Sequence, residues 1–139
     1  LYEACKGKGA MLNGRSIHVS GKNDTQESVV STGFPIDKDR NPDNNLDNLA
    51  RILPMVRGVR RQGSAAFDLC CVAAGILDGY WEFNLHLWDV CAGILIVTEA
   101  GGTVRSFRED RNVPIVVGTP AIVEQLYPRL SDKPGKICL

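Results

Sequence analysis

Apolar residues recur along this chain with the periods of both helices and strands. Residues 46–53 place leucine or alanine at positions i, i+3, i+4 and i+7, which predicts an amphipathic helix that ends at the following proline. Residues 65–76 and 90–97 are apolar on more than one face, so we expect two buried helices. Short runs rich in β-branched residues, bounded by glycine or proline, predict strands at residues 27–32, 56–61, 80–83, 103–107 and 113–117. Strands that alternate with helices indicate an α/β layered domain.

Turn and cap residues indicate where these strands and helices begin and end. Residues 1–20 read as two short strands, and Asn13-Gly14 predicts a hairpin, because both residues tolerate the positive φ of a type I′ turn. Ser64 is a candidate N-cap for the first buried helix, and residues 101–102, both glycine, are a candidate C-cap for the second. Thr119 followed by proline predicts the start of a last helix.

The overall charge disfavours polyanionic partners. The chain has 139 residues, the usual size of one domain, and Lys+Arg and Asp+Glu both number 16. Its longest basic run is Arg60-Arg61, so no strong positive field attracts nucleic acid. The longest apolar stretch, residues 90–97, is far shorter than the ~20 residues of a membrane span. We therefore expect neither nucleic acid nor membrane as a partner.

The cysteines predict a reducing compartment. Five are present, an odd number without a C-x-x-C pair, and two of them are adjacent inside an apolar helical pattern. A disulfide framework or a zinc knuckle is therefore disfavoured. Buried, reduced thiols in a cytoplasmic protein fit better. The five residues are Cys5, Cys70, Cys71, Cys91 and Cys138.

Asp89 is the leading candidate for chemistry. It stands at the head of a long apolar run, directly after Trp88. An aspartate there can be an N-cap, since its carboxylate accepts hydrogen bonds from free backbone N–H groups. The same anchored position suits a metal ligand that Trp88 shields from water. One carboxylate is not a Mg²⁺ site, however, because this ion takes several oxygen ligands in octahedral geometry.

Two further segments are candidates for ligand contacts. Glu82, seven residues before Asp89, is either an outward-facing strand residue or a carboxylate on the rim of the same pocket. Gly63, Ser64 and Ala65 join a strand to a helix start, where small side chains expose backbone N–H groups to ligand oxygens. The alternative for these three residues is a tight turn with a serine cap.

Taken together, these segments resemble the inositol monophosphatase family of Mg²⁺-dependent, lithium-sensitive phosphatases. The family's C-terminal signature, W-D before an apolar helix that ends in A-G-G, stands here as WDVCAGILIVTEAGG. Upstream, GSAAFDLCCVAAGILDGYWE resembles the family's G-[ST]-A helix and the aromatic-Glu strand after it. The segments GKGAMLNGRSIHVS and STGFP match as well, so the resemblance covers nearly the whole chain in the right order.

The resemblance implies a role for each candidate residue. Asp89 would bind a catalytic metal and hold the Mg²⁺ ion nearer the leaving oxygen, and Glu82 would contact a substrate hydroxyl. Gly63, Ser64 and Ala65 would contact the polyol part of a small phosphorylated sugar or polyol. The implied reaction is phosphomonoester hydrolysis by metal-activated water, with two or more Mg²⁺ ions.

The resemblance also implies a fold and an incomplete site. The family fold is an αβαβα layered sandwich, of which residues 1–22 would be the last hairpin of the N-terminal sheet and residues 23–139 the C-terminal α/β domain. The family's upstream Glu and its D-P-[IL]-D-G-T ligands have no counterpart here. Since the chain begins with Leu1, we expect a fragment of a longer enzyme, inactive alone and a homodimer when intact.

Two alternatives stay open. The chain is either half of a phosphatase or a non-catalytic folding or dimerisation fragment. Within the phosphatases, fructose bisphosphate, histidinol phosphate or a phosphonucleotide are alternative substrates to inositol monophosphate, because the signature residues are shared among such enzymes.

Overall fold

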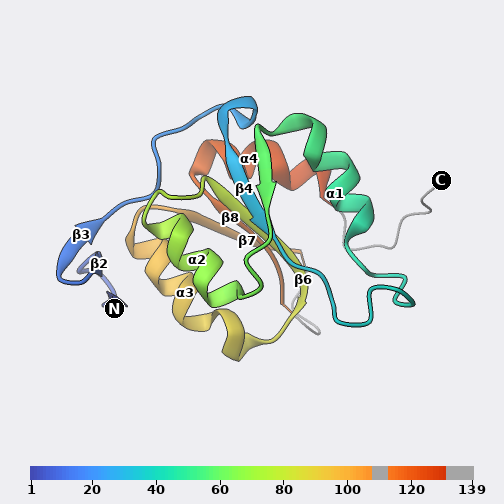
Figure 1. Cartoon of the computed structure of the whole chain (residues 1–139). Coiled ribbons are helices and arrows are strands. Elements are labelled where there is room, and N and C mark those ends of the chain that lie inside the picture. The colour runs from blue at the N-terminus through green and yellow to red at the C-terminus, as the bar shows by residue number, and fades with distance from the viewer. Residues whose placement is uncertain (108–112, 131–139) are drawn as a thin grey trace.

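The computed structural model describes residues 1–107 and 113–130 of the chain (Figure 1). Its helices are α1 Leu46–Ile52, α2 Ala65–Ala73, α3 Leu87–Glu99 and α4 Pro120–Leu126. Short 3₁₀ turns are η1 Thr25–Glu27, η2 Leu53–Met55 and η3 Tyr127–Arg129. The strands are β1 Tyr2–Ala4, β2 Ala10–Leu12, β3 Arg15–Ile17, β4 Val29–Thr32, β5 Gly58–Arg60, β6 Gly79–Leu85, β7 Thr103–Ser106 and β8 Val113–Gly118. The predicted α/β order is confirmed.

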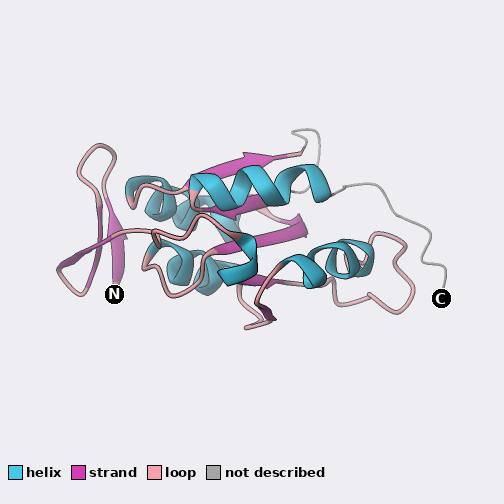
Figure 2. Ribbon diagram, turned by 90° about the horizontal axis from the view of Figure 1, so that it is seen from above, coloured by secondary structure: helices cyan, strands magenta, loops and turns pink. Residues whose placement is uncertain are grey.

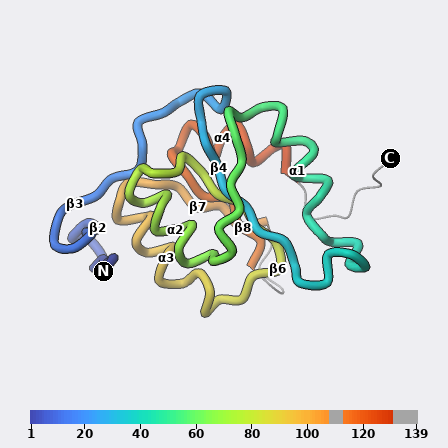
Figure 3. Tube along the Cα trace, viewed as in Figure 1, coloured from blue at the N-terminus to red at the C-terminus, as the bar shows by residue number. Residues whose placement is uncertain are grey.

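A five-stranded mixed sheet forms the centre, in the order β5-β4-β6-β8-β7. Strand β4 runs parallel to β5 and β6, whereas β8 runs antiparallel to β6 and β7. Helices α2 and α3 cover one face of this sheet and α1 and α4 cover the other, so the domain has three layers (Figure 1). Figure 2 shows strands of this sheet among the helices and the N-terminal strands at one end of the molecule. The chain leaves the parallel strands at one edge of the sheet and enters α2 and α3 at that same edge (Figure 3).

Alternating side chains of β6 build both halves of the core. Tyr80 packs with α2 and α3, whereas Trp81 and Phe83 pack with α1 and α4 on the opposite face. Tyr80 and Trp81 are both fully buried. A strand covered by helices on both faces has no solvent side, which explains why YWEF reads as apolar with a single carboxylate between aromatic residues.

The first strands form a separate three-stranded antiparallel sheet, in the order β1-β2-β3. Asn13 and Gly14 have φ values of 51° and 77°, so the hairpin predicted between β2 and β3 is confirmed. This segment has three strands instead of the two expected, because β1 pairs along β2. Ala10 joins the core beneath α2 and α3, which anchors the small sheet to that helical layer.

The predicted cap at Ser64, the predicted helix start at Thr119 and the predicted helix end at residues 101–102 are confirmed. The Ser64 side chain accepts a hydrogen bond from the backbone N–H of Phe67, and that of Thr119 accepts one from Ile122. At the end of α3, Gly101 has a φ of 85° and its N–H donates to the Thr98 carbonyl oxygen at 3.1 Å. These ends are set by local chemistry and are therefore readable from short sequence stretches.

Two predictions about burial are wrong in part. Helix α2 ends at Ala73, earlier than expected, and Phe67 and Ile76 are exposed. The helix covers the sheet from one side and contacts α3 along its flank, which leaves a solvent face.

Cys71 is buried, but Cys5 and Cys91 are exposed. The four cysteines from Cys5 to Cys91 are free thiols, as predicted, and Cys138 lies outside the described residues. No helix in the described ranges is long and apolar enough to cross a bilayer.

Replacing Glu99 with glutamine is expected to loosen the small sheet. The Glu99 carboxylate accepts hydrogen bonds from the backbone N–H groups of Gly7 and Gly9, each at 2.9 Å, and these bonds lower its pKa below the usual 4.5. A lowered pKa means that the ionised form stabilises the fold. The contribution is complete above pH 4.5 and is lost as the pH falls through the folded-state value.

Amide hydrogen exchange at Gly7 and Gly9 measures this contribution. We expect lower protection factors, corrected for the pH dependence of intrinsic exchange, in Glu99→Gln than in the wild type. The wild-type protection factors should fall in the same way as acid protonates the carboxylate. Glu3→Gln, on β1, is the matched control. Equal protection of the two glycine amides in Glu99→Gln and wild type would contradict the anchoring role.

Candidate functional site

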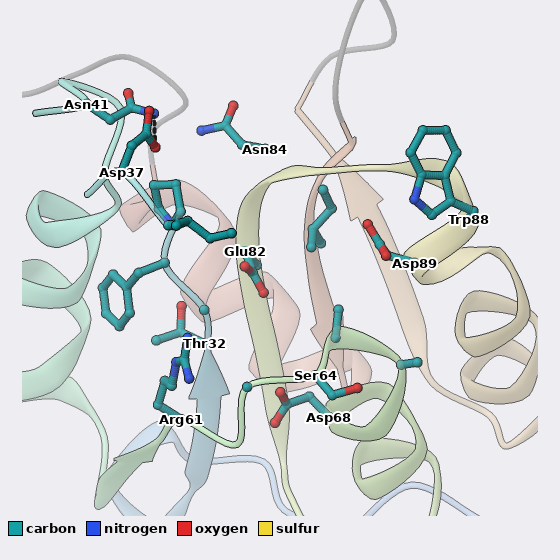
Figure 4. Close-up of a pocket in the computed structure, with 18 residues that line it drawn as sticks. Thr32, Asp37, Asn41, Arg61, Ser64, Asp68, Glu82, Asn84, Trp88 and Asp89 are labelled. Carbon is teal, nitrogen blue, oxygen red and sulfur yellow. Dashed lines mark hydrogen bonds between the residues drawn. The ribbon is translucent and has the colours of Figure 1, made fainter. Parts of the chain in front are cut away.

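A pocket of about 780 Å³ opens where β4 and β6 end and where α2 and α3 begin (Figure 4). Strand β4 ends opposite Trp81 and the parallel strand β6 continues to Leu85, so residues distant in sequence meet beside the second half of β6. Ligands of open α/β sheets commonly bind at the carboxyl ends of parallel strands. The lining residues are Thr32, Gly33, Phe34, Pro35, Ile36, Asp37, Asn41, Arg61, Gly63, Ser64, Ala65, Ala66, Asp68, Glu82, Asn84, Leu85, Trp88 and Asp89.

All five residues singled out from the sequence line this one pocket. Asp89 contributes from the first turn of α3, and Glu82 from the middle of β6. Gly63, Ser64 and Ala65 contribute from the loop that leads into α2 and from its first residue. Figure 4 shows Asp89 on the α3 side and Glu82 between the end of β4 and the start of α2.

Asp89 lies in the first turn of α3 but is not its N-cap. The N-cap is His86, three residues earlier, whose backbone N–H donates to Oδ2 of Asp89 at 3.1 Å. The N-cap prediction was therefore wrong in position, although the carboxylate does satisfy a free donor at the helix start. Trp88 stacks on the His86 ring and is 77% exposed, so it does not shield Asp89 from water as expected.

Glu82 lies on the same face of β6 as Tyr80, which is the face covered by α2 and α3. It is half-buried and lines the pocket, so it is not an outward-facing strand residue. Tyr80, two residues earlier on the same face of β6, donates a hydrogen bond from its hydroxyl to Oε2 of Glu82. Burial raises the pKa of the Glu82 carboxyl above its usual range. The charges of Asp68 and Asp89 act in the same direction, and the hydrogen bond from Tyr80 opposes it.

The segment that leads into α2 lines the pocket with small residues. Gly63 has a φ of 88°, a left-handed conformation that glycine adopts at low cost. Ser64 follows as the N-cap, with its Oγ 3.4 Å from the backbone nitrogen of Phe67. A helix start with small side chains offers N–H donors and a positive dipole end to ligand oxygens. Residues 63–65 therefore form the tight turn with a serine cap and also line the pocket, and their contact with a ligand stays a prediction.

Asp68 and Arg61 are pocket residues that the sequence analysis missed. Asp68 is 1% exposed, and Nε2 of Gln62 donates to its carboxylate at 3.0 Å. Burial raises the pKa of Asp68. The Arg61 guanidinium beside the pocket opposes that rise for both Asp68 and Glu82. An aspartate in the first turn of a helix is common, so its sequence position gave no signal.

A buried polar network fixes the strand end that borders the pocket. The indole N–H of Trp81 donates to Oδ1 of Asn45 at 3.0 Å. Nδ2 of Asn45 donates to Oγ1 of Thr32 at 2.9 Å and to the carbonyl oxygen of Gly33 at 2.8 Å. The Thr32 hydroxyl donates to the Trp81 carbonyl oxygen at 2.7 Å. This network ties the end of β4 to β6 and to the start of α1.

The pocket offers chemistry for a divalent cation but not a complete site. Among the described residues, no group of three or more His, Cys, Asp or Glu side chains is arranged to hold a metal ion. Asp89 offers one carboxylate, and the carboxylate of Glu82 accepts a hydrogen bond from Tyr80. Since Mg²⁺ takes six oxygen ligands, these residues alone do not fit it.

Comparisons with known proteins agree with this architecture. The model of the inositol monophosphatase family matches residues 1–133. A Synechocystis protein named inositol-1-monophosphatase is 46% identical over 107 residues, which cover 77% of this chain and 37% of that protein. A Salmonella typhimurium protein named Nus factor SuhB is 36% identical over 137 residues, 96% of this chain and 51% of that protein.

A solved structure shows the same fold. The inositol monophosphatase from Anabaena superimposes with a TM-score of 0.86 at 36% identity, over 92% of this chain and 55% of that one. The chain spans about half the length of the curated relatives it matches.

Proposed function

The chain belongs to the inositol monophosphatase family, and we propose that it carries the substrate-recognition side of a metal-dependent phosphomonoesterase. The substrate class is a small sugar or polyol phosphate such as inositol monophosphate. One observation carries the proposal: Asp89, Glu82 and the start of α2 line a single pocket at the ends of parallel strands. The full-length protein, of about the relatives' length, is the proposed enzyme.

The proposed metal is Mg²⁺, with Asp89 as one of its ligands. When bound, such an ion activates water and neutralises charge on the leaving oxygen. The remaining ligands would come from the part of the relatives' length that this chain does not cover. The anchoring of Asp89 at the first turn of α3 supports the assignment, because the His86 N–H restrains the carboxylate before any ligand arrives.

The other pocket residues would bind and orient the substrate. Glu82 would accept a hydrogen bond from a hydroxyl of the polyol. The backbone N–H groups and small side chains of residues 63–65 would contact polyol oxygens from the opposite side. A half-buried carboxylate beside a helix start suits a ligand with several hydroxyl groups. It suits an apolar ligand poorly, because such a ligand would displace water from the Glu82 carboxylate without donating a hydrogen bond in its place.

Replacing Glu82 with glutamine is expected to change substrate preference more than metal binding. The amide keeps the shape of the side chain but removes the charge, so the hydrogen bond to a hydroxyl weakens. We expect the KM for a hydroxyl-bearing substrate to rise about two- to tenfold, with a smaller effect on the Mg²⁺ dependence of the rate. Steady-state kinetics across a panel of phosphate esters measure both quantities.

Glu27→Gln, on the exposed η1 turn, is the matched control for that panel. The panel also separates inositol monophosphate from fructose bisphosphate, histidinol phosphate and a phosphonucleotide. If Glu82→Gln had the same substrate profile as the control, the recognition role of Glu82 would be wrong. A full-length protein that released phosphate from none of these esters would favour the non-catalytic alternative.

A role in transcription is a second candidate, because relatives from Salmonella typhimurium and Pseudomonas aeruginosa are named Nus factor SuhB. Such a role would bring nucleic acid or transcription proteins as partners, in contrast to the expectation from the zero net charge. A gel-shift titration of the full-length protein with single-stranded RNA tests direct contact. A salt-sensitive shift would support nucleic-acid binding, and no shift would leave transcription proteins as the partners to test.

The cytoplasmic location and the homodimer remain proposals for the full-length protein. Free thiols at Cys5, Cys70, Cys71 and Cys91 support a reducing compartment. Light scattering after size exclusion would measure the oligomeric state, and a monomeric mass would contradict the dimer.

A further inference from the structure

We propose that Tyr80 and Gly33 are positioning residues that hold the carboxylate of Glu82 toward the pocket and so set the preference for substrates with a hydroxyl group. The inference rests on the proposed function, since Glu82 must meet a substrate for its placement to matter. Two independent contacts carry it, one from the same strand and one from the neighbouring strand.

Gly33 leaves the space that the Glu82 carboxylate occupies. Strand β4 pairs in parallel with β6 so that its last residue, Thr32, lies opposite Trp81. Gly33 directly follows β4, and Glu82 is the next residue along β6. A Cβ atom added at Gly33 would stand 2.1 Å from Oε2 and 2.2 Å from Oε1 and Cδ of Glu82. Any larger residue at position 33 would therefore expel the carboxylate from its place. The requirement is steric.

The position of Gly33 is itself fixed. Its carbonyl oxygen accepts a hydrogen bond from Nδ2 of Asn45 at 2.8 Å, inside the buried network that includes Trp81. The backbone therefore cannot easily move away to admit a side chain. Trp81, the member of this network on β6, packs on the opposite face of the strand from Glu82, so the network supports the pocket from behind.

Tyr80 holds one oxygen of Glu82 and leaves the other for a ligand. Its fully buried hydroxyl donates to Oε2. Burial, followed by the charge of Glu82, raises the pKa of Tyr80 far above its usual value, so the phenol stays a neutral donor at any pH the protein meets. With Oε2 engaged by Tyr80, Oε1 is the atom that would accept from a substrate hydroxyl. The pair therefore selects substrates that can donate at this point.

The experiment compares Tyr80→Phe with the wild type in the full-length protein, using inositol monophosphate and phenyl phosphate, which has no hydroxyl group. Loss of the tyrosine hydroxyl lets the carboxylate rotate, so we expect the KM for inositol monophosphate to rise about three- to tenfold. The rise for phenyl phosphate should be at least threefold smaller. Tyr127→Phe, on the opposite face of the sheet, is the matched control.

Gly33→Ala is the second variant, with Gly21→Ala as its control, because a Cβ at Gly21 meets no atom within 4 Å. We expect Gly33→Ala to reduce the preference for inositol monophosphate over phenyl phosphate further than Tyr80→Phe does. Thermal unfolding checks that each variant is folded. Equal loss for the two substrates in both variants would overturn the positioning role, since it would indicate a general structural defect.

A measurement without turnover separates this inference from the proposed function. The ¹³C resonance of the Glu82 carboxyl, followed against pH, should titrate at higher pH in Tyr80→Phe than in the wild type, because the Tyr80 hydrogen bond lowers this pKa. The facing charges of Asp68, Asp89 and Arg61 are the same in both proteins. An upshift in a protein without phosphatase activity would uphold the positioning and overturn the function. An unshifted titration would overturn the positioning.

Discussion

Replacing Asp89 with asparagine in the full-length protein is expected to lower phosphate release by more than about 100-fold, since even residues behind a metal ligand cost 10- to 100-fold when removed. The amide has the shape of the carboxylate, and its oxygen can still accept from the His86 N–H, so the start of α3 is preserved. It lacks the negative charge that makes a carboxylate a stronger ligand than an amide for a hard cation. The loss should therefore appear in turnover, with a cost to stability of no more than about 1 kcal/mol.

Asp47→Asn is the matched control, because Asp47 also lies in the first turn of a helix, on α1, away from the pocket. Phosphate release and thermal unfolding are measured for both variants. Near-normal phosphate release by Asp89→Asn would contradict the assignment of Asp89 as a metal ligand. A strongly lowered melting temperature for Asp89→Asn alone would mean that the main role of Asp89 is to stabilise the first turn of α3 through its contact with the His86 N–H.

Replacing Trp81 with alanine is expected to destabilise the domain by about 3–5 kcal/mol, the usual cost of truncating a buried aromatic residue. Trp81 is fully buried between β6 and the α1/α4 layer. Its removal also takes the donor from Oδ1 of Asn45 and so weakens the network that holds Gly33. Domains are stable by only about 5–15 kcal/mol, so the variant should be close to unfolding.

Urea unfolding followed by circular dichroism gives the free energy of unfolding. Trp81→Phe is the informative companion, because it keeps most of the apolar volume and removes only the indole donor to Asn45. We expect it to cost about 1–3 kcal/mol, the penalty for an unsatisfied buried acceptor. If Trp81→Ala were within about 1 kcal/mol of the wild type, the network would not be what holds the end of β4.

Features that depend on a few neighbouring residues were readable from the sequence. The Asn13-Gly14 turn and the caps at Ser64 and Thr119 follow from φ preferences and from side-chain oxygens one turn away from their donors. The helix from Leu46 was readable from its period, and it gives way to a 3₁₀ turn at the following proline. In each case the contacts that determine the turn, the cap or the helix join residues no more than four positions apart in the sequence.

Features that depend on contacts between distant segments were not readable. The position of Asn45 against Trp81 requires a left-handed residue, with a φ of 68°, at the start of α1. The space that Gly33 leaves for the Glu82 carboxylate depends on the parallel register of β4 and β6, which brings these two residues together. The exposure of Trp88 also escaped prediction, because it follows from the chain entering α3 at Leu87, with the Trp88 ring stacked on His86 at the surface.

The most direct test is the release of inorganic phosphate from inositol monophosphate by the full-length protein, with Mg²⁺ and after removal of divalent cations by EDTA. The account predicts release that depends on Mg²⁺, disappears with EDTA and returns when Mg²⁺ is restored. Absence of release from inositol monophosphate and from every other small sugar or polyol phosphate tested with Mg²⁺ present would contradict it.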